Sequence, residues 1–356
     1  MKKRTIRSSY MEWAKLRSPA RYNLASSGVM SYPLAELAIR PEDLEINGPN
    51  DFGYPPLLER LARKAGVALD CVVEAIGTSQ ANHLAMAATL DPGDEVLIER
   101  PTYGLLVDVA EYIGADLRRF ERRHEDGYRI DPDEVKRQVT PRTRLIVITN
   151  LHNPSSAYTD EATLRGIGRI AERVGARVLV DEVYLEAMFE QAPRSSFHLG
   201  PQFVATSSLT KGYGLSGLRC GWILAEAALA ERMLHLNDLF NATAAHPAEL
   251  LSVIALDHLP KIAERARKIL AANRAKMDAA LKNVDVFRPE HGTVIFPGLR
   301  NREPEEFFRT LREKYEVSVV PGRFFEEPGH FRVGIGGEPA MTAEGLERLG
   351  TALSAG

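Results

Sequence analysis

Cysteine is nearly absent from this sequence, with only Cys71 and Cys220 among 356 residues. Two cysteines are too few for a disulfide framework and fit a reducing compartment, so we expect a cytoplasmic protein. Long apolar runs are missing as well, and none approaches the roughly 18 residues that a membrane-spanning helix needs. The basic start, MKKRTIRSS, is followed by no apolar segment, which argues against a signal peptide.

Charge of one sign does not dominate the sequence either. Lys and Arg together number 45 and Asp and Glu 48, which gives a formal net charge of −3. A nucleic-acid-binding protein usually carries a basic stripe or a strongly basic domain, so this balance argues against nucleic acid as a partner. The nine histidines show no metal-ligand spacing, and we expect no metal site. With 44% hydrophobic and 26% charged residues, the composition indicates a folded globular protein of about two domains.

Short β-branched runs alternate with helical patterns between about residue 76 and residue 225. The runs are apolar throughout, which indicates strands buried on both faces of a mostly parallel sheet. The predicted strands are 95–99, 144–149, 177–181, 203–208 and 220–225. The predicted helices between them include 79–90, 103–114 and 159–175, the last stopped by Gly175. This order predicts an α/β fold that binds its ligand at the carboxyl ends of the strands.

The pattern of predicted secondary structure changes along the chain and suggests its division into domains. We expect an N-terminal segment, 1–45, that packs onto the rest, and a large α/β domain over 46–245. A long helical stretch, 246–283, connects it to a smaller α+β domain over 284–356. Pro260 should break or kink that stretch, because proline has no backbone N–H to donate within a helix.

The segment SSLTKGYGLSGLRCGW (207–222) is the most informative part of the chain. Its glycines at 212, 214 and 217 match a dinucleotide fingerprint, but that fingerprint needs a helix directly after them, and a strand is predicted there. The predicted strand after the glycines therefore argues against a dinucleotide-dependent dehydrogenase. The alternative is a loop lysine, Lys211, between Ser208 and Arg219, a set suited to holding a phosphate beside an amine that forms an imine.

Two further motifs end predicted strands. Asn153 and Pro154 follow one strand, and Asp181 and Tyr184 form a D-x-x-Y motif at the end of the next. In this order, with S-x-x-K and a later arginine, they resemble the class I/II aminotransferase family of fold-type I pyridoxal-phosphate enzymes. The resemblance runs from about Asn23 to the C-terminus and implies that family's fold: a large domain with a mostly parallel sheet, and a smaller C-terminal α+β domain.

The resemblance implies catalytic roles for three of these residues, Lys211, Asp181 and Tyr184. Lys211 corresponds to the lysine that holds the cofactor, pyridoxal phosphate, as an imine. Asp181 corresponds to the carboxylate that keeps the pyridine nitrogen protonated, which makes the ring an electron sink. Asn153 and Tyr184 correspond to the two donors to the oxygen on the ring.

Other parts of the sequence resemble the family's remaining contacts to the cofactor. The segment AIGTSQANH (75–83) resembles its phosphate loop, in which the amides of Thr78 and Ser79 open a helix. Ser208 and Arg219 would complete the phosphate site. ERPTY (99–103) resembles the motif whose aromatic residue lies over the ring, which makes Tyr103 the stacking candidate.

Substrate contacts are implied near both ends of the chain. In VVPGRFFEEPGHFRV, Arg332 corresponds to the arginine that binds the substrate carboxylate through two parallel hydrogen bonds. Gly28 lies where the family places a glycine whose backbone approaches that carboxylate, and Asn153 contacts the substrate as well. Where the family has a tyrosine for the neighbouring subunit's phosphate, Asn47 and Gly48 stand instead; Tyr54 is close but displaced, so this role stays unassigned.

The function implied is an aminotransferase that takes an L-amino acid and a 2-oxo acid, as a homodimer with active sites at the interface. The core residues also suit a C–S lyase, or a cyclase similar to capreomycidine synthase, on the same fold. A transcription factor built on this fold would need a DNA-binding domain before Asn23, and we expect none. The sequence does not specify the substrate side chain, because the family builds that part of the pocket from loops and the neighbouring subunit.

Overall fold

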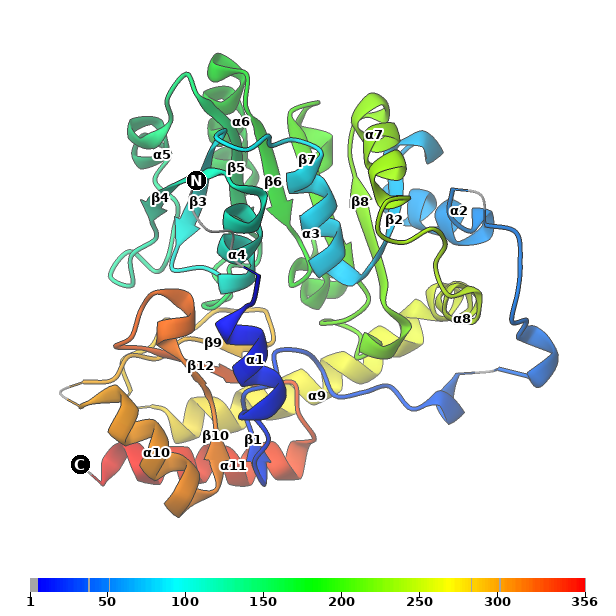
Figure 1. Cartoon of the computed structure of the whole chain (residues 1–356). Coiled ribbons are helices and arrows are strands. Elements are labelled where there is room, and N and C mark those ends of the chain that lie inside the picture. The colour runs from blue at the N-terminus through cyan, green and yellow to red at the C-terminus, as the bar shows by residue number, and fades with distance from the viewer. Residues whose placement is uncertain (1–5, 38, 51, 283, 301, 356) are drawn as a thin grey trace.

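A seven-stranded sheet forms the centre of the computed structural model, which describes residues 6–37, 39–50, 52–282, 284–300 and 302–355 (Figure 1). The strand order is β2-β8-β7-β6-β5-β3-β4. Their bounds are β2 Val72–Ile76, β3 Glu95–Arg100, β4 Asp116–Glu121, β5 Thr143–Thr149, β6 Arg177–Asp181, β7 Phe203–Ser208 and β8 Cys220–Leu224. Only β8 runs antiparallel to its neighbours, so the prediction of a mostly parallel α/β sheet is confirmed.

Two strands of this sheet are missing from the sequence prediction. In β4, the edge strand DLRRFE, only Phe120 is buried. Charged residues are typical of edge strands, where they discourage pairing with another chain, and they hide the apolar run that reveals a central strand. β2 runs up to residue 76, where the predicted alternation of strands and helices begins. It leads directly into α3 (Gly77–Ala87), with no loop between them.

Helices cover both faces of the sheet, so the central strands are buried throughout (Figure 1). One face packs against α3, α4 (Gly104–Ile113) and α7 (Ala227–Asn237). The other packs against α5 (Pro132–Gln138) and α6 (Glu161–Val174), and further along against α2 (Pro55–Ala65) and α8 (His246–Asp257). Gly175 ends α6 in the left-handed conformation, with φ of 71°, as predicted.

The helical stretch after residue 245 is divided at Pro260. α8 ends at Asp257, and α9 (Leu259–Ala280) begins two residues later. Pro260 lies in the first turn of α9, where its missing N–H leaves no helical hydrogen bond unmade, which confirms the predicted break. Residue 283, the last of the expected stretch, lies outside the described residues.

A second, smaller group of strands and helices, the small layer, packs below the large sheet around α9 (Figure 1). It holds a three-stranded sheet in the order β11-β12-β9 and a two-stranded one of β1 and β10. The strands are β1 Tyr22–Asn23, β9 Val294–Ile295, β10 Val317–Ser318, β11 Val320–Pro321 and β12 Phe331–Gly334, and the helices α10 Pro304–Tyr315 and α11 Pro339–Ser354. The expected domain limits after residues 45, 245 and 283 stay a prediction.

The N-terminal segment crosses from this layer to the large sheet. Helix α1 (Ser9–Leu16) lies in front of the junction between the two parts (Figure 1). After it, β1 pairs in parallel with β10, Tyr22 opposite Val317, and ties the segment to the small layer. No described helix combines the length and the apolar content that a membrane span requires.

Candidate active site

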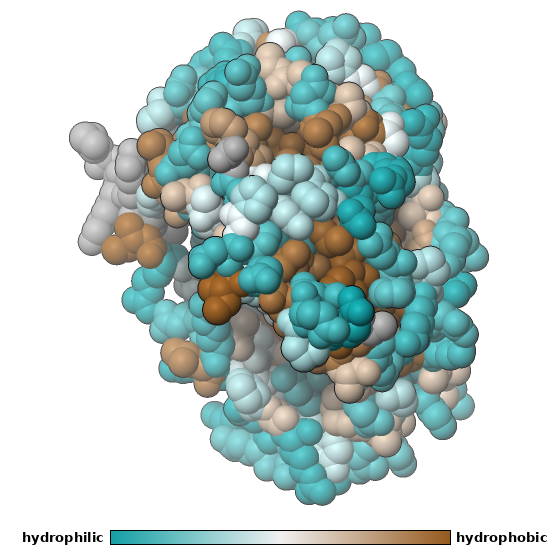
Figure 2. All heavy atoms as spheres, turned by 90° about the vertical axis from the view of Figure 1, so that its right-hand side faces the viewer, coloured by the Kyte–Doolittle hydropathy of each residue, from teal (hydrophilic) through white to brown (hydrophobic). Residues whose placement is uncertain are grey.

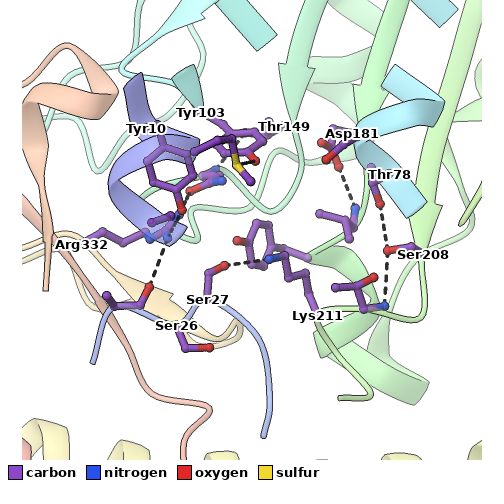
Figure 3. Close-up of a pocket in the computed structure, with 18 of the residues that line it drawn as sticks. Tyr10, Ser26, Ser27, Thr78, Tyr103, Thr149, Asp181, Ser208, Lys211 and Arg332 are labelled. Atoms are coloured by element: carbon purple, nitrogen blue, oxygen red, sulfur yellow. Dashed lines mark hydrogen bonds between the residues drawn. The ribbon is translucent and has the colours of Figure 1, made fainter. Parts of the chain in front are cut away.

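A cavity of about 440 Å³ opens at the carboxyl ends of the central strands, between the sheet, α1 and the small layer (Figure 3). Thr149 ends β5, Asp181 ends β6 and Ser208 ends β7, and all three line it. Figure 3 shows Tyr10 and Arg332 on one side, Thr78, Asp181 and Ser208 on the other, and Lys211 between. The sequence-predicted lining residues are Thr78, Ser79, Tyr103, Asn153, Asp181, Tyr184, Ser208, Lys211, Arg219 and Arg332.

Lys211 stands in the turn after β7 and reaches into the cavity (Figure 3). Its Nζ donates a hydrogen bond of 2.9 Å to Oγ of Ser27. Burial lowers the pKa of Lys211, and the nearby Arg332 lowers it further, while Tyr10 and Asp181 act in the opposite direction. A lowered pKa makes the neutral amine more accessible, and the neutral amine is the nucleophile and the base.

Asp181 is buried against α3. Its Oδ2 accepts a hydrogen bond of 2.8 Å from Nδ2 of Asn82, and its Oδ1 accepts one of 3.1 Å from the backbone N–H of Val183. Thr206, on the neighbouring strand, donates to Oδ1 of Asn82 and fixes that amide. Burial raises the pKa of Asp181 to about 6, although the bonds from Asn82 and Val183 and the charge of Lys211 lower it. A further cationic donor facing Asp181 would stabilise its carboxylate and lower the pKa again.

The start of α3 forms a polar cup at one end of the cavity. Oγ1 of Thr78 donates to Oγ of Ser208 at 2.9 Å, and the N–H of Thr210 donates to the same oxygen at 3.3 Å. Ser79 is exposed at the rim. These hydroxyls lie beside the N–H groups of Thr78 and Ser79 in the first turn of α3, which have no partner within the helix, an arrangement that binds anions.

Close backbone packing holds this cup in shape. Gly77 has φ of 72°, and a Cβ there would lie 2.4 Å from Nη2 of Arg219. The guanidinium of Arg219 therefore lies directly over the turn, where it also donates to the carbonyl of Ile76 at 3.2 Å. Gly221, on the adjacent strand, would place a Cβ 2.6 Å from the backbone of Gly77. Both positions therefore require glycine.

Arg332 is fully buried at the opposite end of the cavity. Its Nη1 donates to Oδ1 of Asn153 and its Nη2 to the hydroxyl of Tyr10, each at 2.9 Å. Its Nε is buried without a partner among the described residues. Because Oδ1 of Asn153 accepts from Arg332, the amide of Asn153 is oriented and its N–H₂ stays available.

Two tyrosines lie on the walls of the cavity. Tyr103 packs edge-on against Tyr10 with 5.3 Å between ring centroids, and its hydroxyl lies 3.6 Å from Sδ of Met11. Tyr184 is buried, and burial raises the pKa of its phenol, while Arg332 and Ser27 lower it. Both tyrosines line the cavity.

Gly28 does not line the cavity, whereas Ala25, Ser26 and Ser27 do. Gly28 packs instead against the backbone of the lysine turn, where a Cβ would lie 3.4 Å from Cα of Lys211. Its position supports the turn and leaves the backbone just before it to face the cavity.

Tyr10, Ser27 and Asn82 hydrogen-bond predicted site residues in the cavity, although the sequence analysis gives them no role. Asn82 could have been found, because it lies one helical turn after Thr78 and therefore on the same face of α3. Tyr10 and Ser27 carry no such signal, since only the path of the N-terminal segment brings them to the site.

The glycines at 212, 214 and 217 form no dinucleotide site. They lead through a short 3₁₀ turn, Ser216–Leu218, into β8, so a strand follows them as the sequence predicts. Gly214 packs against the backbone of Met30, where a Cβ would lie 2.3 Å from its carbonyl oxygen.

The charges of the cavity match a doubly anionic group beside a carboxylate. Lys211, Arg219 and Arg332 face a single acid, Asp181. The N–H groups of Thr78 and Ser79 in the cup, the unpartnered Nε of Arg332 and the buried carboxylate of Asp181 would each gain a partner from pyridoxal phosphate and an amino acid. The residues present therefore fit this cofactor. Among the described residues, no cluster of three or more His, Cys, Asp or Glu side chains could hold a metal ion.

Comparison with known proteins gives matches over most of the chain. The family "Aminotransferase class I and II" matches residues 44–349. Arginine–pyruvate transaminase of Pseudomonas aeruginosa is 28% identical over 81% of this chain and 77% of its own. Capreomycidine synthase of Streptomyces vinaceus is 28% identical over 96% of this chain and 93% of its own.

Solved structures match over the full length. A PLP-dependent aminotransferase from Streptococcus suis superimposes with a TM-score of 0.92 at 29% identity, over 100% of this chain and 99% of its own. The PLP-dependent cyclase OrfR superimposes with a TM-score of 0.87 at 26% identity, over the same shares. Aminotransferases and cyclases thus both lie among the proteins that this chain is similar to.

Proposed function

The chain belongs to the class I and II aminotransferase family, and on that premise we propose that it moves an amino group from an L-amino acid to a 2-oxo acid. The observation that carries this proposal is one cavity shared by Lys211, Asp181 and Arg332. Together they supply an amine to bind the cofactor as an imine, a buried acid to pair with its ring nitrogen and a guanidinium to bind the substrate carboxylate.

We assign the cofactor to the end of the cavity that holds the polar cup at the start of α3. In our proposal, Thr78, Ser79, Ser208 and Arg219 bind the phosphate, and Asp181 binds the ring nitrogen. Tyr103 packs on the ring face, and Asn153 and Tyr184 donate to the ring oxygen. When bound, pyridoxal phosphate supplies an electron sink for the charge that develops at Cα of the substrate.

The substrate end lies at Arg332. Its guanidinium binds the α-carboxylate, and Asn153 orients that guanidinium through the 2.9 Å bond to Nη1. Ser26 and Ser27 line the cavity where Gly28 does not, so we propose that their backbone, in place of Gly28, approaches the carboxylate. Fixing the carboxylate also fixes the position of Cα relative to Nζ of Lys211.

Lys211 moves the proton. Its Nζ takes the proton that leaves Cα of the substrate, a step that requires the neutral amine and is favoured by the lowered pKa of Lys211. Oγ of Ser27 accepts a hydrogen bond from Nζ and holds it in the cavity. The lysine is thus positioned by a residue 184 positions away in the sequence.

An elimination or cyclisation on the same fold is the second candidate. Capreomycidine synthase matches 96% of the chain, and the cyclase OrfR matches all of it. The products discriminate between the two: transamination releases a 2-oxo acid and leaves the aminated cofactor, whereas a lyase releases ammonia and a cyclase returns a cyclised amino acid. Product analysis by mass spectrometry decides between them.

We expect the purified protein to bind pyridoxal phosphate through Lys211, because its Nζ supplies an amine inside the cavity. Reduction with borohydride followed by peptide mapping should find the cofactor attached to Lys211. Lys211→Ala is the matched control and should carry no attached cofactor after the same treatment. Attachment at another lysine, or none after cofactor is added, would contradict the proposal.

We also propose a homodimer, in the cytoplasm, with the active sites at the interface. Apolar side chains gather on the face formed by α2, α7 and α8 (Figure 2). Phe52, Leu239 and Phe240 are more than half exposed there, at 53%, 75% and 57%. Patches of this kind usually mark association surfaces, and twofold pairing is the commonest form. Light scattering should give twice the mass of the chain, and an active monomer would refute the dimer.

A further inference from the structure

A buried ion pair lies behind Thr149, one of the residues that line the cavity, and the proposed function leaves this pair unused. Glu99, near the end of β3, and Arg122, just after β4, both have fully buried side chains. Nη1 of Arg122 donates to Oε2 of Glu99 at 2.7 Å. Apolar residues of similar volume are often as stabilising as a buried ion pair, because removing two charges from water is costly. Stability alone therefore does not account for this pair.

Arg122 holds both ends of the loop that carries Asn153. Its Nη1 donates to the carbonyl of Thr149, before the loop, at 3.4 Å, and its Nη2 donates to Oγ1 of Thr159, after the loop, at 3.2 Å. The two ends are also joined to each other, because the side-chain amide of Asn150 forms two hydrogen bonds of 3.0 Å with the backbone of Thr159. The ion pair thus fixes the base of this loop.

Glu99 sets the direction of the hydroxyl of Thr149. Oε1 of Glu99 accepts hydrogen bonds from the N–H and the hydroxyl of Thr149, of 2.7 and 2.5 Å. Because both oxygens of Glu99 face donors, the proton of this hydroxyl points to Glu99, and the hydroxyl oxygen is left as an acceptor. It accepts from the backbone N–H of Asn153 at 2.9 Å. The position of Asn153 therefore depends on a hydroxyl that Glu99 orients.

Asn153 is thereby held from two sides. Thr149 accepts from its backbone N–H, and its side-chain Oδ1 accepts from Nη1 of Arg332 at 2.9 Å. Its Nδ2 is the atom that the proposed function assigns to the ring oxygen of the cofactor. Hydrogen bonds weaken steeply as their geometry departs from linear, so a small displacement of Asn153 would cost part of that bond.

We propose that Glu99, paired with Arg122, is a positioning residue for Asn153 and acts through the hydroxyl of Thr149. The inference rests on the proposed function, in which Asn153 donates to the ring oxygen, and adds to it residues behind the cavity. Thr149 is the member of this chain of contacts that reaches the cavity (Figure 3).

The absorbance of the bound cofactor reports on Asn153. A donor to the ring oxygen stabilises its negative charge, which lowers the pH at which the imine loses its proton. Glu99→Gln keeps the volume but turns an N–H₂ group toward either Arg122 or Thr149, so that two donors face each other. The midpoint of the pH titration should rise by about half a unit to one unit, the size expected for weakening one hydrogen bond. An unchanged or lower midpoint would overturn the proposal.

Glu95→Gln is the matched control. Glu95 lies on the same strand, is also buried, and accepts a hydrogen bond of 2.6 Å from Oγ1 of Thr143, at the other end of β5 from Thr149. It does not line the cavity, so the midpoint should stay that of the original protein. An equal rise in Glu95→Gln would show that the midpoint responds to any buried glutamate of β3, and would overturn the role of Glu99.

Variants of Thr149 test the path without changing a charge, and do so even if Glu99→Gln fails to fold. Thr149→Val keeps the shape but removes the hydroxyl, so it should raise the midpoint as Glu99→Gln does. Thr149→Ser keeps the hydroxyl and should stay close to the original protein. An original midpoint in Thr149→Val would overturn the proposal.

A double variant separates positioning from charge. Burial is the main cause of the raised pKa of Asp181, but the charge of Glu99 adds to it, so Glu99 also acts on the site without Asn153. Asn153→Ala should raise the midpoint by itself, and adding Glu99→Gln should raise it no further, because both changes act on one bond. A further rise would overturn the positioning role. An original midpoint in Asn153→Ala would contradict the proposed role of Asn153, and this inference with it.

Hydrogen exchange gives a readout on the cofactor-free protein. Peptides that cover residues 150–158 should exchange their amide hydrogens faster in Glu99→Gln and Thr149→Val than in Glu95→Gln, because the N–H of Asn153 loses its oriented acceptor. Equal exchange in all three would contradict the positioning. Faster exchange together with no cofactor on Lys211 after borohydride would instead overturn the proposed function, and with it the role of the loop.

Discussion

Asp181→Ala should lower kcat by at least about 10²- to 10³-fold, the loss typical of removing one preorganised electrostatic partner from an active site. Without a carboxylate at this position, the ring nitrogen loses its proton and the ring no longer accepts the charge from Cα. The variant should retain part of its cofactor, because Lys211 and the phosphate cup remain. Turnover is measured at saturating cofactor with the best amino acid found.

Glu182→Gln is the matched control for this prediction. Glu182 is the next residue, is also buried, and accepts hydrogen bonds of 2.7 and 2.6 Å from the N–H and Oγ of Ser196. It does not line the cavity, so this variant should keep its turnover per folded molecule. Near-normal turnover in Asp181→Ala would mean that Asp181 is only a structural residue at the end of β6.

The stability of the cofactor-free protein separates a catalytic loss from a folding defect. Burial raises the pKa of Asp181 to about 6, above the ordinary 3.8, so the folded protein holds this proton more tightly than the unfolded chain. Ionised Asp181 therefore destabilises the cofactor-free protein as pH rises from about 4 through 6. The Tm of Asp181→Asn minus that of the original protein should grow between pH 4 and pH 7.5, and a difference that shrinks would contradict the assignment.

Arg332→Gln should lower kcat/KM for every amino acid alike, because all carry the carboxylate that Arg332 is proposed to bind. Removing one partner of a buried charge pair typically costs about 2–5 kcal/mol. At about 1.4 kcal/mol per tenfold change, this is roughly a 30- to several-thousand-fold loss. Arg332→Lys should recover little, since an ammonium cannot form two parallel hydrogen bonds to a carboxylate.

Two controls accompany the Arg332 variants. The cofactor should still attach to Lys211 on borohydride reduction, because Arg332 acts on the substrate. Arg323→Gln removes another arginine nine positions earlier, one paired with Glu305 and outside the cavity, and should leave kcat/KM unchanged. If Arg332→Gln kept its best substrate at full efficiency and lost only others, Arg332 would contact the side chain and not the carboxylate.

The sequence by itself determined the central strands of the sheet and several of the residues that line the cavity at their carboxyl ends. Continuous apolar runs predicted the central strands, and Asp181 and Ser208 could be located because each ends such a run. Parallel strands bring their carboxyl ends to one edge, so residues far apart in the chain could be expected in one cavity, and Lys211 and Arg332 line it with them. β4 was not predicted, because it is an edge strand with charged residues and lacks the continuous apolar run that marks a central strand.

Only the tertiary structure decided what surrounds these groups. Asn82 meets Asp181 from 99 positions away, Ser27 meets Lys211 from 184, and Tyr10 meets Arg332 from 322. The helical spacing from Thr78 points to Asn82, but the contacts of Tyr10 and Ser27 depend on where α1 and the segment after it lie in the folded chain, and no local pattern encodes that placement. The same holds for α1, which lines the cavity because pairing of β1 with β10 holds the N-terminal segment beside it.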